Sequence, residues 1–214
     1  LCNIAALRIG LERRRQLCHI SGMPKRSASV AEDTRQSLID AGRKLFSERG
    51  FSNAPTAEIA ARAGVTEGAF FHHFSSKKAL FSAVFESLER DLAERALDAS
   101  RGKPPLDAFL AGCSVYLEFA ERSDFSRIVM IEAPVVLGPE GWRERDSALG
   151  VPAIEAGLKA LMSAGIIARQ PPRALAVLVL GALNEAGLAL ARKEEGLSAR
   201  ACIKALRNLI APGA

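Results

Sequence analysis

The stretch TAEIAARAGVTEGAFFHHFSSKK (56–78) gathers side chains that suit contacts with the bases and phosphates of a nucleic acid. Glu67 can accept a hydrogen bond from a cytosine amino group, and the methyl group of Ala69 can contact a thymine methyl group. His72 and His73 can donate hydrogen bonds to phosphate oxygens or to acceptors on the bases. These groups could read base edges, provided that the local structure turns them toward a partner.

Helical spacing divides this stretch into two short helices joined by a tight turn. Ala60 is small and lets the helices approach each other, while Gly64 can take a positive φ and turn the chain. Thr66 is a favourable N-cap for the second helix, and Phe70 would fill the space between the helices. This arrangement is a helix-turn-helix, in which the second helix enters the major groove of DNA.

The segment from Thr34 to Leu92 resembles the DNA-binding domain of the TetR/AcrR family of bacterial one-component repressors. Three motifs carry the resemblance: AGRKLFSERGF (41–51), EIAARAGVTEGAFFHHF (58–74) and SSKKALFSAV (75–84). It implies an all-α fold, with an N-terminal three-helix helix-turn-helix DNA-binding head followed by a helical ligand-binding and dimerisation domain. Abundant helix formers and the lack of alternating strand-like runs independently favour an all-α class.

Position in the motif then gives each side chain of the head an expected role. In the family the position of Thr56 commonly carries a hydroxyl residue that binds a phosphate, and capping is its alternative role. At Phe71 the family usually has a tyrosine, so this chain keeps an apolar contact and loses a phosphate hydrogen bond. Lys77 follows a helix cap, where cap and cation together can hold a phosphate. The expected DNA-binding residues are Thr56, Thr66, Glu67, Gly68, Ala69, Phe71, His72, His73 and Lys77.

The charge of the chain does not by itself point to a nucleic acid. The 214 residues carry a formal net charge of +5 with a pI near 9.3. Residues 1–30 hold six basic residues against one acidic residue, whereas residues 31–90 hold eight against eight and residues 91–214 fifteen against fifteen. Any basic surface that faces DNA must therefore arise from how the fold arranges the charges in space.

The N-terminal residues differ in character from the rest of the chain. We expect three parts: a leader and basic arm (1–30), the helix-turn-helix domain (31–101) and the ligand-binding and dimerisation domain (102–214). Residues 1–22 lack the order of charge and apolar run of a secretory signal, so we expect a cytoplasmic protein. Because Met23 is a natural start, we hypothesise that residues 1–22 are upstream sequence. The arm Pro24 to Ser29 is expected to be a flexible extension that contacts DNA backbone, or a disordered terminus without a role.

Helical patterns continue through the rest of the chain. The first helix is expected from Ala31 to Arg49, and the fourth, from Lys77 to about Ser100, would link the head to the second domain. Proline and glycine residues then separate the expected helices of the second domain. These span roughly 106–122, 124–137, 147–164, 171–194 and 198–210.

The segment ALAVLVLGALNEAGLALA (174–191) is almost wholly apolar. Its length reaches the lower bound for a membrane span, but Asn184 and Glu185 would be costly in lipid, so we expect no membrane insertion. A helix that is apolar all round must be buried on all sides, which in a chain of this size indicates a partner subunit. The resemblance implies a homodimer in which the helices near 171–194 and 198–210 form a four-helix interface.

The resemblance further implies that the second domain holds a small-molecule effector among its helices. Core packing is the alternative role for each apolar candidate. Glu132 lies within the apolar run IVMIEAPVV, where its carboxylate would meet a ligand cation or pair with Arg127 or Arg143. The expected effector-binding residues are Tyr116, Phe119, Glu132, Trp142 and Asn184.

These observations predict a homodimeric, sequence-specific repressor that an unknown small molecule releases from a double-stranded DNA operator. A ligand-independent or corepressor-dependent regulator is one alternative, and a helical ligand-binding or interaction protein without specific DNA binding is another. The sequence shows no nucleophile–base set, no glycine-rich phosphate loop and no metal-ligand spacing. We therefore expect no enzymatic activity, no metal and no cofactor.

Overall fold

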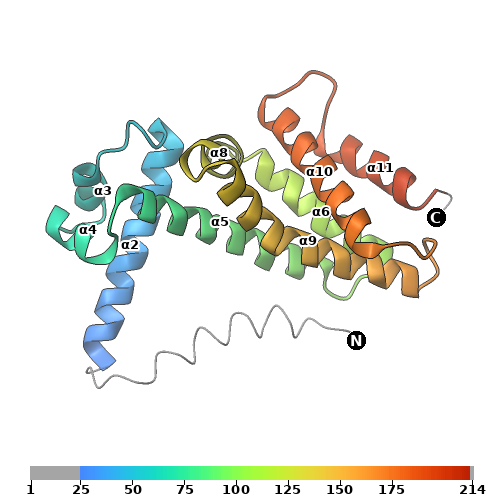
Figure 1. Ribbon diagram of the computed structural model, residues 1–214, viewed down its shortest axis with the longest axis horizontal. Coiled ribbons are helices and arrows are strands. Elements are labelled where there is room, and N and C mark those ends of the chain that lie inside the picture. Colours follow the sequence, from blue (N-terminus) through green and yellow to red (C-terminus); the bar gives the residue numbers. More distant parts are fainter. Residues whose placement is uncertain (1–24, 213–214) are drawn as a thin grey trace. The chain divides into compact units, whose positions relative to one another are not determined.

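The computed structural model describes residues 25–212, with side chains from residue 30 onward, and these residues form helices without strands (Figure 1). The hypothesis on residues 1–22, and Pro24 of the expected arm, lie outside the described residues. Packing divides the chain after Gln36, and residues Ser37–Ala214 form one compact unit. The proposed division of the described part into 31–101 and 102–214 stays a prediction. It falls in the turn between α5 (Lys77–Ser100) and α6 (Pro105–Ala120).

Three helices make up the head: α2 (Lys25–Arg49), α3 (Thr56–Arg62) and α4 (Glu67–His73). The first of them begins at Lys25 instead of Ala31, so residues 25–29 of the expected arm are helical. Ion pairs from Arg49 to Glu58 (2.7 Å) and from Arg62 to Glu48 (2.9 Å) connect α2 to α3.

Helix α5 (Lys77–Ser100) follows the head and packs along α6. Ser76 caps it by accepting a hydrogen bond from Ala79 N at 3.1 Å. One face of α5 is fully buried through Leu80, Phe81, Val84 and Leu88, which join the core of the head. The expected helix 77–100 is therefore present with these bounds, and its apolar face packs against other helices as the spacing predicts.

The rest of the chain forms a helical body (Figure 1). Helices α9 and α10 pack against each other and on α6, and α11 packs on α6. The expected helix 147–164 begins earlier, at Pro139, because proline is well suited to a first helical turn. The elements are α6 (Pro105–Ala120), α7 (Ser123–Phe125), η1 (Ser126–Glu132), α8 (Ala133–Val136), α9 (Pro139–Ser163), α10 (Pro172–Ala191) and α11 (Ala199–Ile210).

Segment η1 is a π-helical turn inside the stretch expected as a regular helix over 124–137. Pro134 follows it and lacks the N–H that an α-helix would direct at the carbonyl of Met130, which favours the wider turn. Such π-helical insertions are rare and occur often at functional sites.

Within the described residues, α10 is the one helix that is long and apolar enough to cross a membrane by length and composition. Of its apolar 18-residue segment, 39% is buried inside the structure. Ala176, Val179, Leu180 and Leu183 form its buried face in the core of the body. Val177 and Leu178 on its other side are 54% and 70% exposed, so coverage of α10 by a partner subunit stays a prediction.

Contacts from η1 hold the end of α2. Glu132 accepts a hydrogen bond from the backbone N–H of Phe51 at 2.6 Å and pairs with Arg127 at 3.3 Å. Arg127 also donates to the carbonyl oxygens of Ser47 (3.3 Å) and Glu48 (3.1 Å). These carbonyls lie in the last turn of α2, where the helix has no acceptor partners of its own, so η1 caps the helix.

We predict that Gly50→Ala destabilises the protein more than Gly64→Ala. Both glycines have positive φ, +80° and +73°, so each alanine costs about 1–2 kcal/mol in backbone strain. A Cβ on Gly50 would also overlap Glu132 Oε1, whereas nothing lies within 4 Å of one on Gly64. Displacing Glu132 leaves Phe51 N–H unpaired, for a further penalty of about 1–3 kcal/mol. Urea unfolding of both variants measures the difference, and equal losses would contradict the role of Glu132.

Candidate functional site

The turn between α3 and α4 has the geometry that the spacing predicts. Ile59, Ala60 and Phe70 are buried between the two helices, and Gly64 turns the chain with φ +73°. Thr66 caps α4 by accepting a hydrogen bond from Ala69 N at 3.2 Å. The helix-turn-helix thus rests on a buried plug, a left-handed turn and a side-chain cap.

The outer face of α4 is open to solvent. Glu67, Gly68 and His72 are exposed, Ala69 and His73 are half-buried, and the ring of Phe71 is 51% exposed. Phe71 rests edge-on against the buried Phe70, with ring centroids 5.1 Å apart. Solvent therefore reaches Glu67, Gly68, Phe71 and His72, and Phe71 presents an apolar ring there.

Thr56 is tied to this face. Its hydroxyl donates a hydrogen bond to Glu67 Oε1 at 2.7 Å, across the turn between the two helices. Pro55, not Thr56, is the residue before the first turn of α3, and no side chain caps that helix. The capping alternative for Thr56 is thus absent, and the bond instead fixes the direction of the Glu67 carboxylate.

Lys77 has partners that the sequence did not indicate. Its ammonium donates to the carbonyl oxygens of Phe51 (2.7 Å) and Ser52 (3.3 Å) and lies 4.6 Å from the centroid of the Phe51 ring. Lys77 therefore fastens the loop between α2 and α3. A phosphate contact remains a prediction, and it would use the third N–H of the ammonium.

In the body, a chain of hydrogen bonds joins α6, α10 and α9. The hydroxyl of Tyr116 donates to Asn184 Oδ1, and Asn184 Nδ2 donates to Asp146 Oδ2 at 3.0 Å. Burial raises the pKa of Asp146, against the opposing effect of the bond from Asn184, and burial also raises the pKa of Tyr116. Two of the expected effector-binding residues, Tyr116 and Asn184, therefore meet at one buried polar centre.

Glu89 of α5 adds a second carboxyl group to this centre. Its side chain is only 6% exposed, and Oε1 has no hydrogen-bond partner. Burial, followed by the nearby carboxylate of Asp146, raises the pKa of Glu89 to about 8. Trp142 lies one helical turn before Asp146 on α9, and its buried Nε1 likewise lacks a partner. We call Glu89, Tyr116, Trp142, Asp146 and Asn184 the buried polar cluster.

Comparison with known proteins identifies two family domains in the chain. The model described as "Bacterial regulatory proteins, tetR family" matches residues 38–84, and that described as "Tetracyclin repressor-like, C-terminal domain" matches residues 106–212. A TetR-family transcriptional regulator from Pectobacterium atrosepticum is 33% identical, with a TM-score of 0.70 over 85% of this chain and 94% of that one. The chain belongs to the TetR family.

Alignments with the curated relatives AcrR and TtgR cover only part of each chain. The transcriptional regulator AcrR of Shigella flexneri is 40% identical over 76 residues, which cover 36% of this chain and 35% of AcrR. The regulator TtgR of Pseudomonas putida is 36% identical over 86 residues, or 39% of this chain and 41% of TtgR. The matches thus span less than half of these relatives. FadR from Bacillus subtilis in complex with stearoyl-CoA, at 16% identity and a TM-score of 0.68, shares the fold.

Two of the expected effector residues of this TetR protein lie outside the buried polar cluster. Phe119 is 3% exposed and packs in the core between the ring of Phe125 (5.6 Å) and the guanidinium of Arg122 (4.4 Å). Glu132 faces the end of α2 and pairs with Arg127, which is one of the alternatives that the sequence left open. Phe119 thus has the core packing, and Glu132 the ion pair, that the sequence offered as alternatives, and contact of either residue with an effector stays a prediction.

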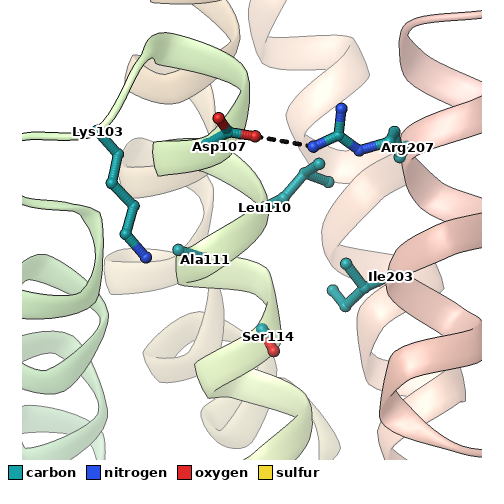
Figure 2. Close-up of a pocket in the computed structure, with 7 residues that line it drawn as sticks. All are labelled: Lys103, Asp107, Leu110, Ala111, Ser114, Ile203 and Arg207. Carbon is teal, nitrogen blue, oxygen red and sulfur yellow. Dashed lines mark hydrogen bonds and ion pairs between the residues drawn. The ribbon is translucent and has the colours of Figure 1, made fainter. Parts of the chain in front are cut away.

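An open groove of about 510 Å³ lies between α6 and α11 (Figure 2). An ion pair between Asp107 and Arg207 crosses it at 2.8 Å, with Leu110 and Ile203 beneath. None of the expected effector residues lines this groove. The ion pair connects α11 to α6. Leu209, on the other side of α11, is 78% exposed.

Sequence reasoning missed Glu89 and Asp146, although each carries a signal in its spacing. Glu89 lies four residues after Phe85 and three before Leu92, which places a carboxyl on the buried stripe of α5. Asp146 lies four residues after Trp142 and so shares its face of α9. A charge on an apolar helical stripe is an informative deviation in a sequence of this kind.

We predict that Glu89→Gln removes a pH dependence from the stability of the folded protein. The pKa of Glu89 rises from its ordinary 4.5 to about 8, so between these values the folded chain keeps a proton that the unfolded chain has lost. The free energy of unfolding then falls as pH rises, by up to about 1.4 kcal/mol per pH unit from this group. A glutamine carries no such proton.

Urea unfolding between about pH 5 and pH 8 measures this effect as the difference between wild type and Glu89→Gln. The free energy of unfolding of the variant should rise steadily relative to that of the wild type as pH rises from about 5 to about 8. Glu86→Gln, on the exposed side of the same helix, is the matched control and should run parallel to the wild type. Parallel curves for Glu89→Gln would show that Glu89 titrates normally in the folded state.

Proposed function

We propose that this TetR-family protein is a homodimeric, effector-responsive transcriptional regulator of the cytoplasm, and that it represses genes by binding a double-stranded DNA operator. The open face of α4 is the observation that carries the proposal. Its inner residue Phe70 is fully buried, while Glu67, Phe71 and His72 are exposed to solvent. A helix held in this way by a turn and a plug can enter a major groove with its polar and apolar groups already placed.

The exposed side of α10 supports the homodimer. Val177 and Leu178 are 54% and 70% exposed, and Gly181 and Ala182 continue the same apolar stripe one turn later. Small residues among larger apolar ones allow close approach of two helices, and an apolar face of this kind is stable in water only when covered. Leu209 on α11 offers further apolar surface. Covering this stripe with a second copy would complete the burial that the apolar sequence of α10 indicates.

Coupling between effector and DNA would pass through η1. At one end of this segment, Met130 reaches Gly187, where a Cβ would lie 2.8 Å from Met130 Cε and 3.4 Å from Tyr116 Cε1. At the other, Arg127 and Glu132 hold the C-terminal turn of α2. An effector at the buried polar cluster would thus contact η1, the segment that holds the head. If the effector binds more tightly to another arrangement of the head, its binding would release the DNA.

Phe71 favours a second candidate function. Since phenylalanine cannot donate the phosphate hydrogen bond of a tyrosine, the chain could be a helical ligand-binding or interaction protein without specific DNA binding. A corepressor-dependent regulator would differ only in the sign of the effector's action. Selection of DNA sequences by the full-length protein separates the first alternative from the proposal, and the effect of effector on the selected DNA separates the second.

We predict that the full-length protein enriches a defined sequence from a pool of random duplexes. The selected site should have two related half-sites roughly 34–36 Å apart, because two copies of α4 must reach successive turns of one groove. Binding should weaken with salt as phosphate contacts release counterions. Glu67→Gln should change the preferred base at one position of each half-site, at about 1–3 kcal/mol for the original base.

Glu86→Gln is the control for the selection, because it removes the same charge from an exposed site on α5. It should leave the selected sequence unchanged. If Glu67→Gln lowers the affinity for every DNA sequence by the same factor, Glu67 does not contact a base. Failure of the wild type to enrich any sequence would favour the interaction protein.

We predict that Leu178→Glu separates the dimer into monomers. A carboxylate in the middle of the covered stripe would be buried without a partner, which is strongly unfavourable. Sedimentation equilibrium measures the mass in solution. Val135→Glu is the matched control, since Val135 on α8 is also exposed, at 84%, and lies outside α10 and α11. A Leu178→Glu protein that stays dimeric would place the interface elsewhere.

A further inference from the structure

The buried polar cluster contains two carboxyl groups, those of Glu89 and Asp146, and no basic side chain. Among the side chains of residues 30–212, neither Glu89 nor Asp146 forms an ion pair, and Glu89 Oε1 has no hydrogen-bond partner. Buried carboxyl groups in proteins are normally paired, because an isolated one is costly to ionise. Its five members come from four helices, with two on α9 and one each on α5, α6 and α10, so the packing of one helix does not explain the cluster.

The groups around Glu89 all favour a cation over an anion. Asp146 on α9 and Tyr116 on α6 are the titratable groups that act electrostatically on Glu89 or on each other, and each is neutral or negative. Asn184 is already committed to both of its neighbours through its oxygen and nitrogen. An anionic ligand would meet two carboxyl groups here without a basic residue to balance it.

Apolar groups line the same place. The ring of Phe125 meets Tyr116 edge-on at 6.2 Å, and Met130 and Tyr116 both approach Gly187. The indole of Trp142 packs against the core cluster that contains Phe125 and Met130. Aromatic faces attract cations, and a methionine side chain can move to admit a ligand of irregular shape.

We propose that the effector of this protein is an organic cation with an apolar body, whose positive centre binds between Glu89 and Asp146 while its apolar part contacts Trp142 and Met130. The inference rests on the proposed effector-responsive function and names the chemical class that the site takes. It separates this chain from the relative whose structure holds stearoyl-CoA, since the phosphates of such a ligand would find no basic partner at this cluster. Glu89 is the residue that sets the preference for charge.

The test compares probes of one shape and different charge. Phenyltrimethylammonium, its neutral isostere tert-butylbenzene and the anion benzenesulfonate form one set, and tetraphenylphosphonium with tetraphenylborate forms a larger pair. Titration calorimetry gives the affinities, and the fluorescence of Trp142, which is the single tryptophan of the chain, reports on the site. The wild type should bind at least one of the cations at least about tenfold more tightly than its neutral or anionic counterpart.

Variants and pH then assign the charge preference to Glu89. Because Glu89 is mostly protonated at pH 7 and mostly ionised at pH 9, the affinity for a permanent cation should rise about tenfold between them. At pH 7 calorimetry in buffers of different ionisation enthalpy should show release of most of one proton. Glu89→Gln should lose the cation preference and the pH dependence, while the exposed Glu86→Gln should keep both.

The outcomes distinguish this proposal from the function on which it rests. Equal affinity for cation and isostere, an unchanged preference in Glu89→Gln, or no cation binding would overturn the cationic effector. If the protein still selects a DNA sequence in that case, the regulator stands and its effector has another chemistry. If cations bind as expected but no DNA is selected, the site stands and the proposed regulation fails. Release of the selected DNA by the cation supports both.

Discussion

The carboxylate of Glu132 joins the parts of the molecule that regulation has to connect. It accepts a hydrogen bond from Phe51 N at 2.6 Å and holds Arg127, which in turn caps the last carbonyls of α2. These bonds satisfy carbonyl groups at the C-terminal end of α2, and a movement of the head relative to η1 would break them. Arg43 adds a second connection through ion pairs to Asp91 and Asp124, both at 2.8 Å. The head is thus held by bonds whose energies depend on the position of the body.

The helix-turn-helix could be predicted from the sequence because its determinants are local. Ala60, Gly64 and Phe70 lie within eleven residues of each other, and each acts on its own turn or on the adjacent helix. The bounds of α5, α10 and α11 also follow from caps and apolar spacing. The expected start of α9 is too late because the segment 138–141 (GPEG) was interpreted as a break, whereas within it only Gly138 lies outside the helix.

The sites in the body depend on contacts between distant segments, and the sequence could not supply these. Tyr116 and Asn184 are separated by 68 residues and Asn184 and Asp146 by 38, so their hydrogen-bonded chain exists only once three helices have packed. The same holds for Lys77, whose ammonium finds the carbonyl of Phe51 across 26 residues. For Glu132 the alternatives were stated correctly, but the choice between ligand and arginine required the position of η1 against α2.

A buried carboxyl group that keeps its proton avoids the cost of a buried charge and can still ionise beside a cation. A permanently charged group at the position of Glu89 would destabilise the empty body, whereas an amide there would leave nothing to attract a cation. Burial raises the pKa of Glu89 to about 8, so the group is mostly neutral at pH 7, and under the proposed cationic effector it would become a counter-ion when the positive charge binds. Met130 of η1 packs against Gly187 beside Tyr116, so under the same proposal a ligand at the buried polar cluster would contact the segment that holds the head. Such a contact would give a cationic effector different affinities for two positions of η1, which regulation by a ligand requires.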